Sequence, residues 1–379
     1  MSTTIWSYPT RILFGAGSAK ACGQEAKALE LARVLLVTDP GVVNAGLTRT
    51  IEAALAAEGI QVARFSELSS NPTEAEVEAG AAEYLRQGAQ GVVAVGGGAA
   101  MDVAKLIVVR SQLKHSFEEL DDAKGGDRLI PKVLPPVLAV PTTAGTGSEV
   151  GRAAVLTVRS TGSKTVIFAP SMLPKVAILD PELSVSLPKG ATAATGFDAL
   201  THCLEAYLAK GDHPLADSIA LGGLELIARS LVRAVQNGSD LEARGNMLKA
   251  AMMGAAAFQK GLGACHSLSH PLSAELDVHH GLANALCLPA VVDFNESVVP
   301  ERVRRVSVVL GGSPEPGGCA RRIVELREQL GIAGGLGKVG VTAELLPRLA
   351  KLALADGCHG GNPRVCREED FRAMYTASL

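Results

Sequence analysis

One carboxylate and several histidines in the second half of the sequence have the spacing of a metal site. Asp198 and His202 are four residues apart in the segment GFDALTHCLEAYL, so on a helix both side chains project from one face. His266 follows His202 by 64 residues, in the segment CHSLSHPLSAELDVHHG, and His280 lies near the other end of that segment. We therefore expect one carboxylate and several imidazoles to bind a single divalent metal ion.

The histidine-rich segment offers more ligands than one ion needs. His270 lies four residues after His266, on the same helical face, and His279 directly precedes His280. Spacing alone does not choose among these four side chains. A carboxylate with imidazoles suits Fe²⁺, Zn²⁺, Mn²⁺ or Co²⁺, and such an ion acts as a Lewis acid on an alcohol or carbonyl oxygen.

Two loops in the first half of the sequence are typical of phosphate binding. In GVVAVGGGAAMDVAK, residues 91–105, Gly96, Gly97 and Gly98 separate a buried strand from a helix. The N-terminus of that helix would offer free amides and a partial positive charge to a pyrophosphate. The loop PTTAGTGSE, residues 141–149, follows another apolar strand and supplies several hydroxyl groups. Because such loops converge on one crevice in an open α/β sheet, the pair favours a dinucleotide cofactor.

These loops differ from the usual dinucleotide fingerprint. Neither matches GxGxxG, and GAGSAK at residues 15–20 has Lys20 in its sixth position, so we interpret it as an ordinary turn. Asp39 ends the strand VLLVTD, where it would either accept hydrogen bonds from a ribose or cap the following turn. The first role would repel a 2′-phosphate and favours NAD over NADP. Asp102 and Lys105 belong either to the cofactor site or to the solvated surface.

The hydrophobic pattern indicates two domains. Up to about residue 185, short apolar runs alternate with amphipathic segments, which predicts a parallel sheet covered by helices. Beyond Pro188 the strand signals fade, which predicts a helical bundle. We expect an α/β NAD-binding domain over 1–185 and a helical metal-binding domain over 186–379. The expected strands are 34–39, 61–65, 91–96, 136–142 and 176–180, and the expected helices include 45–58, 73–87, 213–236, 241–258, 300–311 and 316–330.

Composition favours small-molecule chemistry. The formal net charge is −3, so the chain has no basic field for nucleic acid or an anionic membrane, and aromatic residues make up only 3%. No uncharged apolar run is long enough for a membrane span, and residues 1–15 lack the pattern of a secretory signal. Seven cysteines without CxxC spacing fit reduced thiols. We expect a cytoplasmic protein.

Taken together, the motifs resemble a known family. GGGxxxDxxK, PTTAGTGSE, ATGFDALTHCLEAY, HSLSHPL, HHGLANALCLP and DGCHGGNPR occur in this order along the whole chain. In this respect the sequence is similar to the iron-containing, group III metal-dependent alcohol dehydrogenases, in the branch of lactaldehyde reductase and 1,3-propanediol dehydrogenase. The resemblance implies a dehydroquinate synthase-like architecture, NAD, Fe²⁺ or alternatively Zn²⁺, and a homo-oligomer such as a homodimer.

The resemblance also implies roles for individual residues. The metal ligands would be Asp198, His202, His266 and His280. His270 would be a catalytic residue that contacts substrate or relays a proton. The residues around NAD would be Asp39, Asn71, Gly96, Gly97, Gly98, Asp102, Thr142, Thr143 and Thr146.

The substrate expected from the sequence is a small alcohol or aldehyde. Lys260 stands where the family commonly has a neutral polar residue, and Arg152 follows the threonine-rich loop. Together these cations would recognise a carboxylate, phosphonate or sulfonate on a short aldehyde. Two other functions are alternatives: an NAD-assisted, metal-dependent lyase of the dehydroquinate synthase type, and a non-catalytic scaffold stabilised by metal. The Asp198 ligand argues against the lyase.

Overall fold

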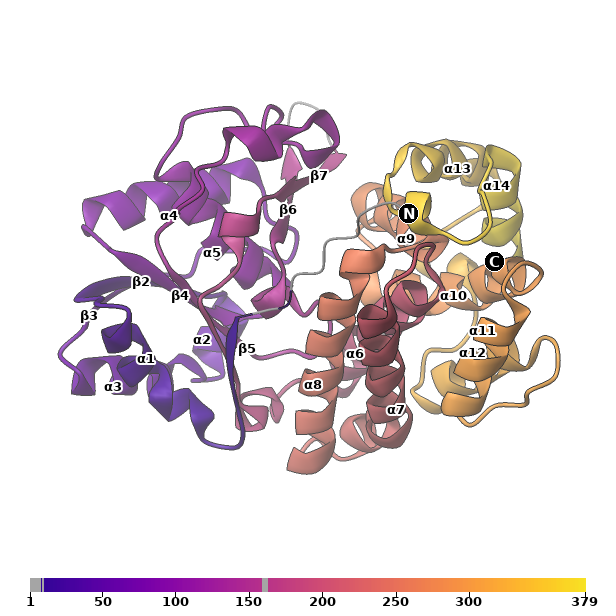
Figure 1. Ribbon diagram of the computed structural model, residues 1–379, viewed down its shortest axis with the longest axis horizontal. Coiled ribbons are helices and arrows are strands. Elements are labelled where there is room, and N and C mark those ends of the chain that lie inside the picture. The colour runs from indigo at the N-terminus through magenta and orange to yellow at the C-terminus, as the bar shows by residue number, and fades with distance from the viewer. Residues whose placement is uncertain (1–7, 9, 159–162) are drawn as a thin grey trace. The chain divides into compact units, whose positions relative to one another are not determined.

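The computed structural model describes residues 8, 10–158 and 163–379 (Figure 1). Residues 1–7, part of the N-terminal stretch used above to expect a cytoplasmic protein, lie outside the described residues. The contacts divide the chain into two compact units. The α/β unit comprises Tyr8–Thr143 and Gly147–Leu187, and the helical unit comprises Ala144–Thr146 and Pro188–Leu379.

A parallel sheet forms the centre of the α/β unit, and within the described residues it has six strands in the order β1-β8-β5-β4-β2-β3. Side chains alternate between its faces: Leu35 and Val37 belong to one apolar cluster, and Val34 and Leu36 to another. Both faces are therefore buried, as in other parallel sheets. The strands are β1 (Arg11–Phe14), β2 (Arg33–Val37), β3 (Gln61–Phe65), β4 (Gly91–Gly96), β5 (Val137–Pro141) and β8 (Val176–Leu179).

Helices cover both faces of this sheet. Helices α1 (Cys22–Ala28) and α3 (Thr48–Ala57) contribute to the cluster that contains Val34, whereas α4 (Glu74–Arg86) and α5 (Gly98–Arg110) contribute to the cluster that contains Leu35. The short helix α2 (Pro40–Asn44) follows β2. An antiparallel hairpin of β6 (Ala153–Val158) and β7 (Ser163–Phe168) packs beside α5.

The strand order brings the proposed cofactor loops together. Strand β4 lies between β2 and β5, so the carboxyl ends of these three strands are neighbours. The backbone N–H of Thr142 donates to the carbonyl of Gly96 at 2.9 Å, which joins the two loops directly. The chain runs from β2 outward to β3 and then returns to β4 on the other side of β2. Such a reversal is where open α/β sheets bind ligands.

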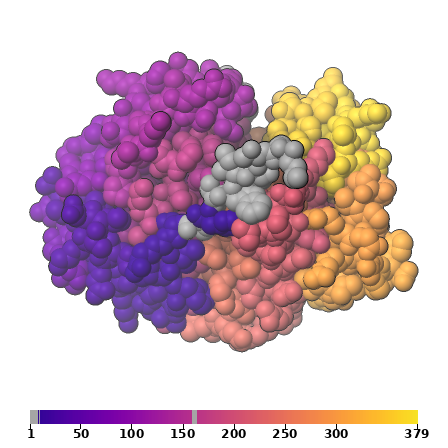
Figure 2. Space-filling view, viewed as in Figure 1, coloured from indigo at the N-terminus to yellow at the C-terminus, as the bar shows by residue number. Residues whose placement is uncertain are grey.

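The helical unit is built around α6 (Lys189–Leu208), which is buried along almost its whole length and packs against α7, α8 and α10 (Figure 1). A helix that is apolar on most sides is stable only inside a protein. The other helices are α7 (Pro214–Gln236), α8 (Leu241–Ala257), α9 (Ala264–Leu276), α10 (His280–Glu296), α11 (Pro300–Val309), α12 (Gly318–Gln329), α13 (Leu346–Ala355) and α14 (Glu368–Ala377). Figure 2 shows the α13–α14 segment, in yellow, beside the α11–α12 segment, in orange.

The predicted fold class is confirmed: an α/β unit with a parallel sheet precedes a helical unit. Each expected strand corresponds to one of β2, β3, β4, β5 and β8. Strand β1 and the β6–β7 hairpin were not expected, because four-residue and half-buried strands give weak periodicity. Among the described residues, no helix has both the length and the apolar composition to cross a membrane.

Candidate active site

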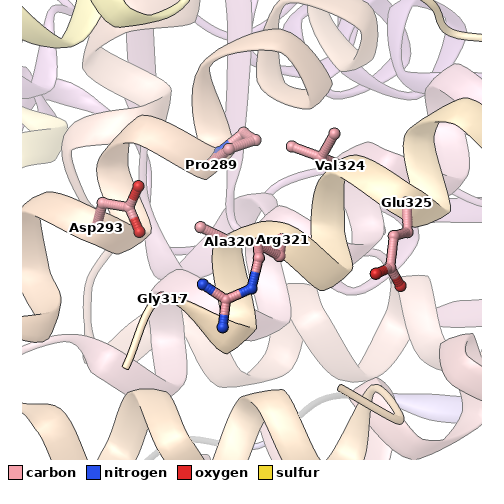
Figure 3. Close-up of a pocket in the computed structure, with 7 residues that line it drawn as sticks. All are labelled: Pro289, Asp293, Gly317, Ala320, Arg321, Val324 and Glu325. Atoms are coloured by element: carbon pink, nitrogen blue, oxygen red, sulfur yellow. The ribbon is translucent and has the colours of Figure 1, made fainter. Parts of the chain in front are cut away.

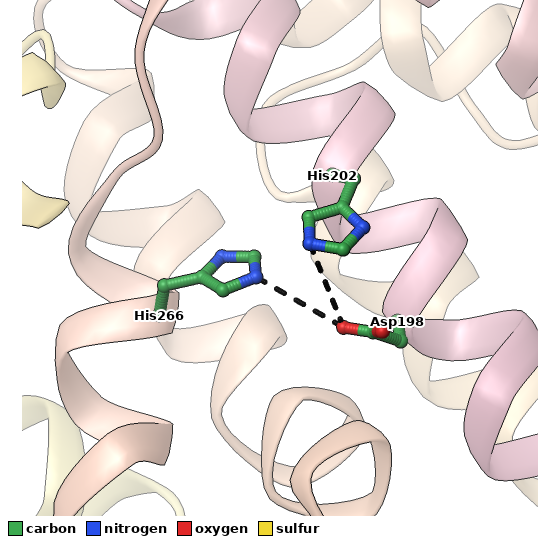
Figure 4. Close-up of side chains that lie close together, drawn as sticks. All are labelled: Asp198, His202 and His266. Atoms are coloured by element: carbon green, nitrogen blue, oxygen red, sulfur yellow. Dashed lines mark ion pairs between the residues drawn. The ribbon is translucent and has the colours of Figure 1, made fainter. Parts of the chain in front are cut away.

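Three helices of the helical unit bring a carboxylate and three imidazoles to one point. Asp198 and His202 lie one turn apart on α6, His266 is in the first turn of α9, and His280 is the first residue of α10. Figure 4 shows His202 above Asp198 and His266 to its left, with a line from each ring to the same carboxylate oxygen. Residues far apart in sequence thus meet, as the motifs and their resemblance to the family predicted.

The distances suit a shared metal ion better than direct contacts. From Asp198 Oδ1, the Nε2 atoms of His202, His266 and His280 lie at 3.8, 3.9 and 3.5 Å. These separations are too long for hydrogen bonds. Two atoms that each lie about 2.1 Å from a tetrahedral ion are about 3.4 Å apart, which is close to the observed spacing.

His266 provides an independent test of whether a metal fits. Its Nδ1 atom lies 2.5 Å from Glu205 Oε2, so this nitrogen carries the proton that is shared with the carboxylate. Its Nε2 atom is buried and has no hydrogen-bond partner among the described residues. An unpartnered buried nitrogen is costly, whereas a cation in the cluster would use its lone pair. The donor set therefore fits a divalent metal.

A second layer of hydrogen bonds orients the proposed ligands. Glu205 also accepts a hydrogen bond from the Cys265 N–H at 2.6 Å through Oε1. Asn284 donates from Nδ2 to Asp198 Oδ1 at 2.9 Å. Such outer partners fix ring orientation and raise the basicity of a ligand. Glu205 was missed in the sequence, although its position three residues after His202 places it on the same helical side.

The electrostatic environment differs between two of the histidines. Burial lowers the pKa of His202, although the Asp198 carboxylate acts in the opposite direction. Burial also disfavours the charged form of His266, but Glu205 and Asp198 outweigh it and raise the pKa of that ring. Both effects follow from placing imidazoles among carboxylates in a site that excludes water.

Close helix packing positions His280 beside Asp198. A side chain at Gly281 would place its Cβ 2.1 Å from the carbonyl oxygen of Ala194 and 3.3 Å from Asp198 Cβ. Only glycine lets the first turn of α10 approach the α6 backbone this closely. The geometry of His280 therefore depends on its neighbour in sequence.

His270 borders this cluster without joining it. Its Nδ1 lies 2.7 Å from Asp356 Oδ2, and its ring stacks on that of His280 with centroids 5.3 Å apart. The ring of His266 lies edge-on to it at 6.0 Å. Burial alone would raise the pKa of Asp356, but hydrogen bonds from His270, Ser267 and the Cys358 N–H hold it below its usual range.

The glycine turn and Asp39 lie together in the α/β unit. Asp39 caps α2, because its Oδ1 accepts a hydrogen bond from the Val42 N–H at 3.0 Å. Gly96 has φ +154°, and a Cβ there would lie 2.8 Å from Ala100 Cβ and 3.2 Å from Asp39 Oδ2. The second carboxylate oxygen of Asp39 therefore faces the turn that precedes α5. Capping and cofactor binding are compatible roles for this residue.

Lys105 is buried and only 16% of the Asp102 side chain is exposed, so the interpretation of these residues as solvated charges is wrong. Lys105 is fully buried and donates to Ser148 Oγ at 2.6 Å and to the Ala153 carbonyl at 2.9 Å. Asp102 accepts from Ser148 Oγ at 2.6 Å and from the Val155 N–H at 3.0 Å. Burial lowers the pKa of Lys105 against the pull of Asp102. The network fastens α5 to the end of the threonine-rich loop.

The remaining expected cofactor residues lie in or near these loops. Thr142 directly follows β5, and a Cβ at Gly97 would lie 3.3 Å from Thr143 Oγ1. Thr146 belongs to the short Ala144–Thr146 segment that groups with the helical unit. Asn71 lies in the loop before α4, where its carbonyl accepts from Ser69 Oγ at 3.0 Å.

The family models decide between the functions considered so far. Residues 9–181 match the model for iron-containing alcohol dehydrogenase. Residues 192–379 match the model for the C-terminal part of the Fe-containing alcohol dehydrogenase family. The chain belongs to the iron-containing alcohol dehydrogenase family. The resemblance of its motifs is thereby confirmed, and the lyase and scaffold alternatives lose their support.

Full-length relatives agree with this family. The chain is 42% identical to 4-hydroxybutyrate dehydrogenase of Cupriavidus necator, over 98% of this chain and 99% of that protein. The structure of a 1,3-propanediol oxidoreductase is similar with a TM-score of 0.95 at 34% identity, over 99% of this chain and 100% of that one. Sulfoacetaldehyde reductase from Bifidobacterium kashiwanohense, solved in complex with NAD⁺, gives a TM-score of 0.91 at 30% identity, over 100% and 99% of the chains.

This iron-containing alcohol dehydrogenase is accordingly an oxidoreductase that acts on alcohols and aldehydes with NAD and a divalent metal, Fe²⁺ in this family. Its two cations expected near the substrate differ in environment. Only 2% of the Lys260 side chain is exposed, and it donates to Asp217 Oδ1 at 2.5 Å and to the Tyr207 carbonyl at 3.1 Å, so its ammonium group already has an anionic partner. Arg152 lies against the ring of Phe168, 5.7 Å from its centroid.

The helical unit of the dehydrogenase also has a surface pocket. It has a volume of about 410 Å³ and lies between α10 and α12 (Figure 3). Asp293, Arg321 and Glu325 line it, with Pro289 and Val324, and it contains none of the residues around Asp198. We assign it no role in the reaction.

Proposed function

We propose that Asp198, His202, His266 and His280 hold one Fe²⁺ ion and that NAD binds at the carboxyl ends of β2, β4 and β5. The observation that carries the proposal is the convergence of three Nε2 atoms on Asp198 Oδ1, at 3.5 to 3.9 Å. A bound metal of this kind polarises an alcohol or carbonyl oxygen, and NAD(H) exchanges the hydride.

The chain's own groups would position the cofactor. The amides of Gly97 and Gly98 open α5 and would bind the pyrophosphate, since a helix N-terminus attracts anions. Thr142 and Thr143 follow the neighbouring strand β5 and would add hydroxyl groups. Asp39 would accept hydrogen bonds from the adenosine ribose and disfavour NADP. Asn71, Gly96 and Thr146 complete the proposed set of cofactor-binding residues. Asp102 would contribute through its hydrogen bonds to Ser148 and Val155, which hold α5 beside the threonine-rich loop.

His270 is the proposed catalytic residue of the protein. It lies beside two proposed ligands, and Asp356 occupies its Nδ1 atom. Its Nε2 atom is then the position at which the ring would hold the proton that leaves the alcohol during oxidation. A positioned acid or base of this kind contributes roughly 10²- to 10⁴-fold to a rate.

We propose a short alcohol or aldehyde that carries an anionic group as the substrate. Two relatives support this class: a 4-hydroxybutyrate dehydrogenase at 42% identity and a sulfoacetaldehyde reductase at 30% identity. Among the described residues no carboxylate forms an ion pair with Arg152, whereas Lys260 pairs with Asp217. Arg152 is therefore the better candidate of the two for recognising the anion, by bidentate hydrogen bonds.

A matched pair of substrates tests this proposal. We expect kcat/KM to be higher for 4-hydroxybutyrate than for 1,4-butanediol, which has the same carbon chain without the charge. Arg152→Ala should reduce kcat/KM for the acid about 10- to 100-fold and leave the diol nearly unchanged, since a hydrogen bond to a charged group contributes about 1.5–3 kcal/mol. Lys260→Ala is the matched control and should affect both substrates alike. A preference for the diol in the unmodified protein would contradict the proposal.

We also propose that the protein is a homo-oligomer in the cytoplasm. The seven cysteines are free thiols, which supports a reducing compartment. Light scattering during size-exclusion chromatography would measure the oligomeric state. A monomer at micromolar concentration would contradict the proposed homo-oligomer.

A further inference from the structure

The C-terminal loop of the helical unit contains a carboxylate that neither the metal cluster nor the cofactor loops use. Asp356 follows α13 and precedes the 3₁₀ turn η10 (Cys358–Gly361). Its Oδ2 lies 2.7 Å from Nδ1 of His270, and both side chains are about one-fifth exposed, at 20% and 21%. The pair joins the helix that carries His266 to a loop almost ninety residues further along the chain.

The other oxygen of Asp356 fixes the carboxylate in place. Oδ1 accepts a hydrogen bond from Ser267 Oγ at 2.7 Å and from the Cys358 N–H at 2.9 Å. The His359 N–H in turn donates to Ser267 Oγ at 2.9 Å. Oδ1 therefore accepts two hydrogen bonds that fix the carboxylate, and Oδ2 is directed at the imidazole of His270.

We propose that Asp356 is a positioning residue that holds His270 in one orientation and one tautomer, with the proton on Nδ1 and the lone pair on Nε2. The inference rests on the proposed function of His270 and deepens it. A carboxylate accepts but does not donate, so an imidazole beside it must present N–H there. The second ring nitrogen is then fixed as the one that exchanges a proton with substrate.

The thiol of Cys358 also lies close to this pair. The ligand atoms of His270, Asp356 and Cys358 are within 4.8 Å of one another, a spacing that a second metal ion would tolerate. The hydrogen bonds to both carboxylate oxygens already account for the arrangement, however, and burial beside Asp356 raises the pKa of the Cys358 thiol, which disfavours the thiolate that metals bind. The positioning role is therefore the better interpretation.

The decisive variant is Asp356→Asn, which keeps the shape of the side chain but can turn an N–H toward His270. We expect kcat to fall by roughly 10²-fold or more, because the ring loses the tautomer that its role requires. The metal content and the Kd for NADH should stay within about twofold of the unmodified protein. Ser267→Ala is the comparison variant: it removes one of the two hydrogen bonds to Oδ1 but keeps the bond from the Cys358 N–H and the pair with His270, so the loss of kcat should be clearly smaller than in Asp356→Asn.

A double-mutant cycle separates positioning from loop stability. If Asp356 acts through His270, Asp356→Asn should cause almost no additional loss in protein that already carries His270→Ala. An equally large loss in both backgrounds, or equal losses for Asp356→Asn and Ser267→Ala, would overturn the inference. If the unmodified protein oxidises NADH with an aldehyde while Asp356→Asn is equally active, the positioning role fails and the proposed function stands.

A readout independent of turnover is the tautomer itself. In zinc-loaded protein, which is diamagnetic, NMR of isotope-labelled histidine should show His270 with its proton on Nδ1. Asp356→Asn should shift the ring toward the other tautomer, and Ser267→Ala should not. An unchanged His270 signal in Asp356→Asn would contradict the proposal even if that variant folded poorly enough to lose activity.

Discussion

Buried and half-buried carboxylates hold the histidines of this dehydrogenase in place. Glu205 binds Nδ1 of His266, and Asp356 binds Nδ1 of His270, in each case leaving Nε2 for chemistry. Asp198 is itself oriented by Asn284. At the scale of single residues, the site therefore depends as much on groups that touch neither metal nor substrate as on the ligands.

Glu205→Gln should weaken metal binding. The amide can accept or donate at His266 and no longer fixes the proton on Nδ1, so we expect a 10- to 100-fold loss of metal affinity. Competition with a chelator of known affinity measures the change. The exposed Glu225→Gln is the control. Unchanged affinity in Glu205→Gln would show that Glu205 does not support the metal site.

The buried Glu149 should make stability depend on pH. Burial raises the pKa of Glu149 from 4.5 to about 7, although its own N–H and Lys105 act in the opposite direction. Between these two values the unfolded chain releases a proton that the folded protein keeps, so stability falls as pH rises and levels off above about 7. Glu149→Gln should therefore be stabilising, by about 1–2 kcal/mol more at about pH 8 than at about pH 5.5.

Urea unfolding of the metal-free protein at the two pH values measures this difference. In the control Glu225→Gln, at an exposed position, the free energy of unfolding should change between the two pH values by the same amount as in the unmodified protein. If the stabilisation by Glu149→Gln were equal at both pH values, the carboxyl group would not be titrating in this range.

At the residue scale, the four side chains that we propose as metal ligands could be selected from the sequence, but their supporting groups could not. Asp198 and His202 were found from helical spacing, and the resemblance chose His266 and His280 among four histidines. Asp356 gave no such signal, because it meets His270 only through tertiary packing. The burial of Lys105 could not be predicted, since a charged residue on a helix is usually solvated and its burial depends on Ser148 and the hairpin.

At the scale of helices, the close contact of Gly281 on α10 with α6 sets the geometry of the proposed metal site. In Gly281→Ala the new Cβ would overlap the Ala194 carbonyl, at 2.1 Å, so α10 must move away from α6. We expect a loss of about 1–3 kcal/mol and weaker metal binding. The control is Gly190→Ala on α6, where a new Cβ meets nothing within 4 Å, and it should be neutral or stabilising. Thermal unfolding and metal titration of both variants test this, and equal behaviour would contradict it.

Two variants separate the helix-capping role of Asp39 from its proposed role in cofactor binding. Asp39→Ser retains a good N-cap but removes the charge, so it should lower the preference for NADH over NADPH with little change in stability. Asp39→Ala should lower that preference equally and also cost about 0.5–2 kcal/mol of stability. Steady-state kinetics with both cofactors and urea unfolding measure the two effects. An unchanged cofactor preference in Asp39→Ser would show that the carboxylate only caps the helix.

Elements with strong periodicity could be predicted from the sequence, and weak ones could not. Strands β3 and β4 were predicted with the bounds they have. Strand β4 is a continuous apolar run that ends at the glycine turn, and β3 begins just after Gly59, so turn residues mark where each lies. Strand β1, only four residues long, lies at the edge of the sheet and pairs with β8 from the other end of the unit. Its pairing partner is about 165 residues away, and local patterns carry no information on that contact.

At the scale of the whole molecule, the metal should act as a structural link as well as a catalyst. Its proposed ligands come from α6, α9 and α10, so the ion would add a further link between helices that already meet through apolar packing and through the hydrogen bonds of Glu205 and Asn284. A ligand that binds only the folded state stabilises it by about 2.7 kcal/mol at a hundredfold excess over its Kd. Removal of the metal should therefore lower the Tm, and His266→Ala should abolish the difference between metal-loaded and metal-free protein.

The most direct test of this account is an anaerobic titration of metal-free protein with Fe²⁺, with NADH oxidation by a short aldehyde as the readout. We predict that turnover rises linearly and levels off at one ion per chain, and that His266→Ala still binds NADH but shows no such rise. Full turnover without added metal, or an unchanged titration curve in His266→Ala, would contradict the assignment of the site.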